Sequence, residues 1–217
     1  MKTKQLSSKQ LIALVLILIG AVSSIFGITG LTKSSSEDPY ESRNGIVMVY
    51  ATVYDNEGNS EAGMGTGWAI GTPGQPIQYI VTNGHVVNKA YTYPRYDSSL
   101  YGGEIDVFFS AAENDYVKAK VVYFSPQEEK DIAILQLPSP TDKRTALMLR
   151  DSGDIKIGDP AYALGYPGNS SQRQDFATYD IDDITITRGI ISKRTTTSFS
   201  TYEAFQMDVS IAPGNSG

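Results

Sequence analysis

The sequence predicts an all-β protein, because it is built from short apolar and β-branched segments separated by turns rich in Gly, Pro and Asn. From residue 46 onward these segments follow one another closely, and no convincing amphipathic helix of twelve or more residues occurs after residue 32. Alternation of strands and helices is therefore absent, and a barrel or a sandwich is the expected architecture. The 217 residues suffice for one large all-β domain or for two small ones.

The expected strands fall into two groups on either side of a polar, proline-containing stretch at residues 138–154. The first group comprises residues 46–53, 65–70, 79–82, 105–109, 116–124 and 132–137. The second group comprises residues 160–164, 184–191 and 204–210. This distribution predicts two β units joined by a linker, the first at about 44–140 and the second at about 155–217.

Composition excludes several classes of function. The chain has no cysteine and a single histidine, so disulfides, thiolate zinc sites and cysteine nucleophiles are excluded and a bound metal is not expected. The formal net charge is −6, and no basic block lies outside the first ten residues, so nucleic acid is not an expected partner. Nothing in the sequence indicates a cofactor or an oligomeric state.

The N-terminus predicts a location at a membrane. Residues 1–10 carry three lysines and no acid, and residues 11–31 carry no charge. At about 1.5 Å per residue a helix of this length nearly spans the hydrocarbon core. We expect an uncleaved signal anchor with a cytoplasmic basic segment, an external body, and a polar linker at residues 32–43. The alternative is a cleaved signal peptide with its small-residue site at Ala21–Ser23, which would give a secreted protein.

The segment around Ser216 is a candidate nucleophile site. Gly214 and Gly217 flank the serine closely, and Pro213 stiffens the approach. Glycine permits a positive φ and a close approach of substrate, and consecutive N–H groups in such a segment can converge beside the hydroxyl. A surface turn is the alternative, because these are also the usual turn residues.

A base and an acid for this serine can be named. His85 is the only histidine, and we expect it at a strand end that opens on a glycine turn. Asp131 leads an apolar strand, where its carboxylate is costly unless it is hydrogen-bonded, so it is the candidate to orient the imidazole. A strand-capping role is the alternative for Asp131. Asp106, expected to point outward from a strand, and Asp115, expected in a turn, are weaker candidates.

The order of these residues along the chain favours one catalytic arrangement. His85, Asp131 and Ser216 follow the order of chymotrypsin, whereas histidine comes last in α/β-hydrolases. A nucleophile elbow of the G-x-S-x-G kind would also require strand–helix alternation before the serine, and that alternation is absent.

Five segments together resemble the successive motifs of trypsin-like serine peptidases. They are TNGHVV (82–87), DIAILQL (131–137), ALGYPG (163–168), TRGIIS (187–192) and DVSIAPGNSG (208–217). The resemblance is greatest to the bacterial HtrA/Deg branch, with the cysteine-free glutamyl endopeptidases as a second possibility, and it extends from about residue 44 to residue 217. It implies a double β-barrel of chymotrypsin type, with an active site between the barrels that cleaves protein or peptide substrates.

The resemblance also implies roles for single residues. His85 would be the general base, Asp131 would orient it, and Ser216 would attack the scissile carbonyl. The backbone N–H groups of Gly214 and Ser216 would form the oxyanion hole. Ser210 takes the position of the acid that selects Lys and Arg in trypsin, so a preference for small or medium apolar residues is expected. The alternative function is a catalytically silent domain that acts as a protein-binding or chaperone module.

The chain departs from the trypsin pattern in two respects. The neutral Asn215 stands where trypsin-type enzymes have the aspartate that pairs with a newly cut N-terminus, so we expect no activation by N-terminal cleavage. Family members also continue past this serine with several more strands. We therefore expect the 217 residues to be part of a longer protein, with an incomplete second barrel.

Overall fold

The structure is a computed structural model, and it describes residues 38–95, 97–110, 112, 115–167, 180–196 and 203–217. The predicted anchor at residues 11–31 and the first half of the predicted linker at 32–43 lie outside these ranges. Within them, no helix has both the length and the apolar character needed to cross a membrane. The described residues belong to one compact unit, Asp38–Gly217.

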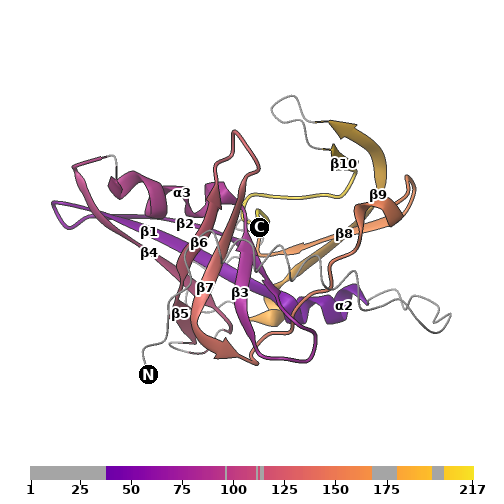
Figure 1. Ribbon diagram of the computed structural model, residues 1–217, viewed down its shortest axis with the longest axis horizontal. Helices are drawn as coiled ribbons and strands as arrows, with labels where there is room; N and C mark the ends of the chain where they lie inside the picture. Colours follow the sequence, from indigo (N-terminus) through magenta and orange to yellow (C-terminus); the bar gives the residue numbers. More distant parts are fainter. Residues whose placement is uncertain (1–37, 96, 111, 113–114, 168–179, 197–202) are drawn as a thin grey trace, which may run out of the picture. The chain divides into compact units, whose positions relative to one another are not determined.

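A seven-stranded antiparallel sheet forms the first half of this unit (Figure 1). Its strand order is β5-β4-β1-β2-β3-β7-β6. The edge strand β5 also contacts β7, which lies next to the opposite edge, so the sheet curls into a half-barrel. The strands are β1 (Ile46–Asp55), β2 (Ser60–Ile70), β3 (Ile77–Thr82), β4 (Leu100–Phe108), β5 (Tyr116–Lys118), β6 (Lys120–Ser125) and β7 (Ile132–Thr141).

A second, three-stranded antiparallel sheet follows, in the order β10-β9-β8. It comprises β8 (Pro160–Gly165), β9 (Thr185–Thr196) and β10 (Glu203–Met207). From β10 the chain runs back to the first sheet, where its last residues are bonded to β2 (Figure 1).

Strand β1 is buried on both faces over its first four residues. Val47 and Val49 belong to the core inside the curled sheet, whereas Ile46 and Met48 belong to a second cluster together with Tyr166. Successive side chains of a strand point to opposite faces, so the continuous apolar run IVMV supplies both cores at once.

The described helices are short. They are α2 (Pro39–Ser42), η1 (Arg43–Gly45), α3 (Gly84–Thr92), η2 (Tyr93–Arg95), η3 (Ser152–Asp154) and η5 (Ile181–Asp183). Helix α3 contacts strands from both halves of the curled sheet, including β1, β4 and β7. Its Val87 and Ala90, three residues apart and therefore on one face, lie in the core inside the sheet.

An all-β fold was predicted, and the described residues are mostly β with a few short helices. Each expected strand has an observed counterpart, but several local expectations were wrong. Residues 116–124 form two strands, β5 and β6, because the chain changes its pairing partner at Ala119: β5 pairs with β4, and β6 pairs with β7. Strand β7 continues to Thr141, into the segment expected to be a linker. The last expected strand ends at Met207 instead of residue 210.

Two segments expected to be irregular are helical. Residues 39–42 of the predicted polar linker form α2, capped by the carboxylate of Asp38, which accepts from the N–H of Tyr40 (2.9 Å). Residues 84–92 form α3 where a strand end and a turn were expected. The helix was missed because it is only nine residues long and its stability depends on burying Val87 and Ala90 in the core. The boundaries of the two predicted β units stay a prediction.

Candidate active site

Helix α3 presents His85 from its second residue, immediately after β3. Asn83 is in an extended conformation (φ −71°, ψ 148°), so the chain turns from strand to helix within one residue. Gly84 allows this turn to pack closely, because a Cβ there would overlap the carbonyl oxygen of Ser125 and lie 3.3 Å from the amide nitrogen of Ile132. The close packing places the start of α3 beside the start of β7.

Asp131 is bonded to His85 through both its carboxylate oxygens. The two oxygens lie 2.8 Å and 3.1 Å from Nδ1 of the ring, and Oδ1 also accepts from the backbone N–H of His85 (2.9 Å). The side chain of Asn83 donates to the carbonyl of Asp131 (2.8 Å). These contacts fix the ring and favour the tautomer that carries its proton on Nδ1 and leaves Nε2 as an acceptor.

The backbone of Asp131 adopts an uncommon conformation. Its φ is 51°, and among the described residues it is the one non-glycine residue with positive φ. Aspartate tolerates the left-handed region better than most residues, but such conformations still cost energy and tend to occur at functional sites. The hydrogen bonds to Asn83 and His85 supply the contacts that hold Asp131 in this conformation.

The segment that carries Ser216 is attached to β2 at Thr66. The N–H of Thr66 donates to the carbonyl of Ser216 (2.7 Å), and its hydroxyl donates to the carbonyl of Gly214 (2.8 Å). The N–H of Asn215 closes a turn onto the carbonyl of Ala212 (3.1 Å). Ser216 is therefore held by a rigid strand, although it lies in a segment without regular structure.

Gly65 brings the segment of Ser216 close to the helix of His85. A Cβ on Gly65 would lie 2.6 Å from the side chain of Val86 and 2.9 Å from the carbonyl oxygen of Ser216. Val86 follows His85 directly in α3, so both segments pack against the space beside one glycine that a side chain would fill. Gly65 and Thr66 were not among the predicted site residues; the signal that could have indicated them is the Gly-Thr-Gly sequence inside an otherwise apolar strand.

The backbone around Ser216 has donors available for a ligand. Gly214 has a φ of 97°, in the region that favours glycine. Within the described ranges, the N–H groups of Gly214 and Ser216 have no hydrogen-bond acceptor, and the hydroxyl of Ser216 is not hydrogen-bonded to the ring of His85. Catalytic hydrogen bonds are often long in enzymes without substrate.

The other candidate residues lie elsewhere. Ser210 is exposed, and its carbonyl accepts from the hydroxyl of Thr187 (2.6 Å). Asp115 pairs with Lys143. Asp106 points away from the core of the curled sheet, as expected, but it is half-buried, and its Oδ1 has no partner within the described ranges. Burial raises the pKa of Asp106.

Tyr166 and Arg144 are buried polar residues that are hydrogen-bonded to strands of the curled sheet. Tyr166, which is 2% exposed, donates its N–H to the hydroxyl of Thr66 (3.1 Å). Burial raises the pKa of its phenol to about 12, so the phenol stays neutral at physiological pH. The buried guanidinium of Arg144 donates to the carbonyls of Ile46, Lys143 and Phe109.

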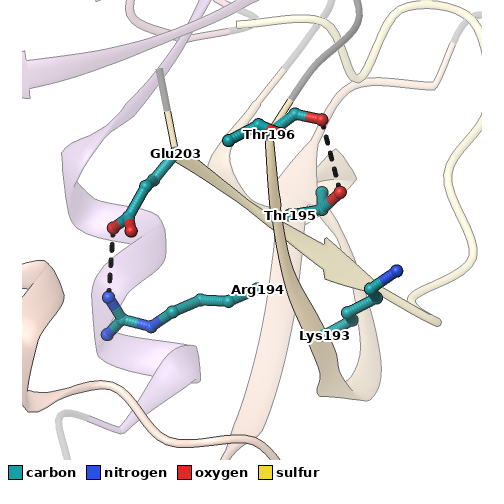
Figure 2. Close-up of a pocket in the computed structure, with 5 residues that line it drawn as sticks. All are labelled: Lys193, Arg194, Thr195, Thr196 and Glu203. Carbon is teal, nitrogen blue, oxygen red and sulfur yellow. Dashed lines mark hydrogen bonds and ion pairs between the residues drawn. The ribbon is translucent and has the colours of Figure 1, made fainter. Parts of the chain in front are cut away.

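A separate hollow of about 360 Å³ lies on the β9–β10 hairpin. Figure 2 shows Arg194 and Glu203 pointing toward each other there, at 3.2 Å. None of its lining residues is among the predicted site residues. Within the described ranges, no group of three His, Cys, Asp or Glu residues is arranged to hold a metal ion.

Comparison with known families identifies the chain. The family model of the trypsin-like peptidase domain matches residues 65–217, which is more than half of the sequence. The chain belongs to this family. The matched region includes the segments of His85, Asp131 and Ser216, together with Thr66.

Its relatives among characterised proteins are HtrA/Deg serine proteases, which confirms the resemblance noted in the sequence. The serine protease Do-like HtrA of Lactococcus lactis subsp. cremoris is 29% identical over 195 residues, covering 90% of this chain and 42% of that protein. The periplasmic serine endoprotease DegP of Salmonella typhimurium is 31% identical over 142 residues, covering 64% of this chain and 24% of that protein. The chain thus spans less than half the length of these relatives.

Solved structures show the same fold. The crystal structure of Deg5 matches with a TM-score of 0.52 and 22% identity, covering 78% of this chain and 71% of that one. The crystal structure of the serine endoprotease from Yersinia pestis matches with a TM-score of 0.50 and 22% identity, covering 85% of this chain and 53% of that one. The half-barrel and the second sheet therefore follow the chymotrypsin-like arrangement of the family.

Proposed function

We propose that this chain contains the catalytic residues of a serine endopeptidase that cleaves proteins outside the cytoplasm. The observation that carries the proposal is the bond between Asp131 and Nδ1 of His85, on a helix whose next residue packs against the same glycine as Ser216. A buried or half-buried carboxylate on one ring nitrogen leaves the other nitrogen to accept a proton, which is the requirement for a general base.

The reaction follows from these positions. The Oγ of Ser216 attacks the scissile carbonyl while Nε2 of His85 takes the hydroxyl proton. Asp131 accepts a hydrogen bond from the Nδ1–H of His85 throughout and stabilises the imidazolium that forms. His85 then protonates the leaving amine, which departs and leaves an acyl-enzyme. Water then attacks the acyl group with His85 again as base, the ester bond to Oγ of Ser216 breaks, and His85 returns the proton to Oγ as the carboxylic acid product leaves.

The oxyanion that develops in each tetrahedral intermediate would be bound by the N–H groups of Gly214 and Ser216. Both lack an internal acceptor within the described ranges, and the positive φ of Gly214 requires a residue without Cβ. Backbone donors of this kind typically contribute about 3 kcal/mol each to lowering the barrier. The mechanism needs no metal and no cofactor.

Replacing Ser216 by alanine tests the function. In the full-length protein Ser216→Ala should lower kcat on casein by about 10⁶ while leaving the fold intact, because the triad acts as a unit. A fluorophosphonate probe should label the parent at Ser216 and leave the variant unlabelled. A parent that neither cuts casein nor reacts with the probe would favour the alternative, a silent trypsin-like domain that binds proteins as a partner or chaperone.

Substrate preference and location are part of the proposal. The small, neutral Ser210 favours cleavage after small or medium apolar residues, which a peptide library incubated with the full-length enzyme would reveal. The uncharged segment 11–31 favours a single-pass anchor in the cell membrane, with the catalytic residues on the extracytoplasmic side. Release of the protein by a carbonate wash, or a mature N-terminus near Ser24, would argue for secretion instead. DegP and DegQ, two relatives, are described as periplasmic.

A further inference from the structure

Thr66 contacts the nucleophile segment at two points and is itself almost inaccessible. It is 2% exposed and lies on β2, between two glycines. Its N–H donates to the carbonyl of Ser216 (2.7 Å), and its hydroxyl donates to the carbonyl of Gly214 (2.8 Å). The side-chain hydroxyl and the backbone N–H of Thr66 therefore bind the first and the last residue of the segment Gly214–Ser216, which contains the candidate nucleophile.

These two bonds restrict the backbone donors of the proposed oxyanion hole. Each peptide group is planar, so fixing a carbonyl also fixes the N–H of the next residue. The bonds to Gly214 and Ser216 hold the peptide planes on either side of the one that carries the Ser216 N–H. With both neighbours held, that N–H has little freedom to rotate away from the direction in which it points.

The hydroxyl of Thr66 is held in turn by its own neighbours. It accepts from the N–H of Tyr166 (3.1 Å), so its single proton is directed to the carbonyl of Gly214. The carbonyl of Thr66 accepts from the hydroxyl of Thr82 on β3 (2.7 Å). The hydroxyl that bonds Gly214 is thus oriented by the chain that follows β8, whereas the bond from Thr82 joins β2 to β3 through the Thr66 carbonyl and does not reach the segment of Ser216.

Two glycines, Gly165 and Gly217, lie so close to Thr66 that neither could carry a side chain. A Cβ on Gly165 would lie 2.6 Å from the Thr66 hydroxyl, and a Cβ on Gly217 would overlap the Thr66 carbonyl. Glycine at both positions is what lets the backbone of the nucleophile segment approach β2 closely enough for the hydrogen bonds.

We propose that Thr66 is a positioning residue that holds the Ser216 segment and its backbone donors in the geometry needed for turnover. The proposal rests on the function proposed above. Thr66 does not touch the reacting atoms; it acts through the carbonyls of Gly214 and Ser216. Preorganised donors contribute most when they need not reorganise during the reaction, so loss of the hydroxyl should slow the chemical step more than it weakens substrate binding.

The test compares three variants of the full-length protein. Thr66→Val removes the hydroxyl at nearly constant volume, and Thr66→Ser restores it. Thr82→Val is the matched control, since it removes an equally buried hydroxyl (1% exposed) whose bond goes to Thr66 and not to the nucleophile segment. For each protein we would measure kcat and KM on a peptide, the rate of fluorophosphonate labelling, and Tm.

We expect turnover to fall in Thr66→Val but not in Thr66→Ser or Thr82→Val. Thr66→Val should lower kcat and the labelling rate by about 100-fold, as expected for a misplacement of about 1 Å, with KM little changed. Thr66→Ser should recover most of this loss. Thr82→Val should lower Tm comparably but keep the kcat of the parent. If Thr82→Val slowed turnover as much as Thr66→Val, or if Thr66→Val kept the kcat of the parent, the positioning role would be refuted.

Amide hydrogen exchange tests the positioning role of Thr66 independently of whether the protein is an active peptidase. In a Ser216→Ala background, which needs no activity, Thr66→Val should speed exchange in peptides covering residues 208–217, and Thr82→Val should not. A parent that is inactive and unlabelled would overturn the proposed peptidase and with it the role of Thr66 in turnover. Unchanged exchange in Thr66→Val would overturn the positioning role even if the parent is an active peptidase.

Discussion

Gly65 packs against both helix α3 and the segment of Ser216, and the structure leaves no room there for a larger residue. A Cβ at this position would lie 2.6 Å and 2.8 Å from the two methyl groups of Val86, and 2.9 Å from the carbonyl oxygen of Ser216. Carbon atoms pack best at about 3.5–4.0 Å, so Gly65→Ala creates an overlap of close to 1 Å on the Val86 side. Neither neighbour yields easily, because valine is stiff at χ1 and the oxygen belongs to the backbone.

The overlap must be relieved by moving α3 away from β2, by moving the Ser216 segment, or by both. Overpacking of this kind costs about 1–3 kcal/mol of stability. A shift of about 1 Å between the base and the nucleophile should lower kcat by about 100-fold. Gly65→Ala should therefore show a modest loss of stability together with a large loss of turnover.

Gly63 provides the matched control. It lies two residues earlier on the same strand and on the same face, and a Cβ there would have no atom within 4 Å. Gly63→Ala and Gly65→Ala make the same chemical change, so urea unfolding and steady-state kinetics of the two full-length proteins isolate the effect of the contact. A Gly65→Ala enzyme whose kcat lies within about threefold of the Gly63→Ala enzyme would refute the claim that this glycine sets the distance between α3 and Ser216.

Three further predictions concern other polar groups of the unit. Asp131→Asn should lower kcat by about 10⁴ in steady-state assays with little change in Tm, because a neutral amide no longer favours the required tautomer; a loss below tenfold would contradict this role. Because burial raises the pKa of Asp106, the folded protein binds this proton more tightly than the unfolded chain, and the parent loses stability as pH rises through the folded-state pKa. Asp106→Asn should therefore raise Tm at pH 7, with a gain that disappears below about pH 4; an equal gain at both pH values would show that ionisation is not the cause. Arg144→Met should cost about 3 kcal/mol or more in urea unfolding, because it leaves buried carbonyls unpaired, whereas the exposed Arg150→Met should change stability by less than about 0.5 kcal/mol; equal effects would argue against the buried bonds.

The strands could be predicted because their signals are local. Apolar, β-branched runs such as residues 46–53 and 132–137 are bounded by turn residues, and β1 and β7 form there. Helix α3 could not be predicted in this way. Its nine residues are too few to be stable alone, and the energy that forms it comes from burying Val87 and Ala90 against strands distant in the sequence.

Some residues of the candidate site could likewise be named from the sequence, and others could not. His85 and Ser216 could be named from the sequence, since one is the only histidine and the other lies in a glycine-rich segment. Asp131 could be proposed as their partner, with strand capping as the alternative, and the structure shows its carboxylate bonded to Nδ1 of His85. Thr66 was not named from the sequence, because a threonine in a strand is ordinary and only the glycines on either side of it set it apart.

The sequence by itself determined the class of fold, the candidate residues for the chemistry, and their order along the chain. These depend on side-chain type and on local periodicity, which a linear pattern records. The tertiary structure decided that His85 begins a helix, that Asp131 bonds its ring, and that β2 holds the Ser216 segment through Thr66. Such contacts join residues separated by 46 positions in the case of Asp131 and His85, and by 148 in the case of Thr66 and Gly214. They depend on how strands pair and curl around a core, and no local pattern of residues encodes that geometry directly.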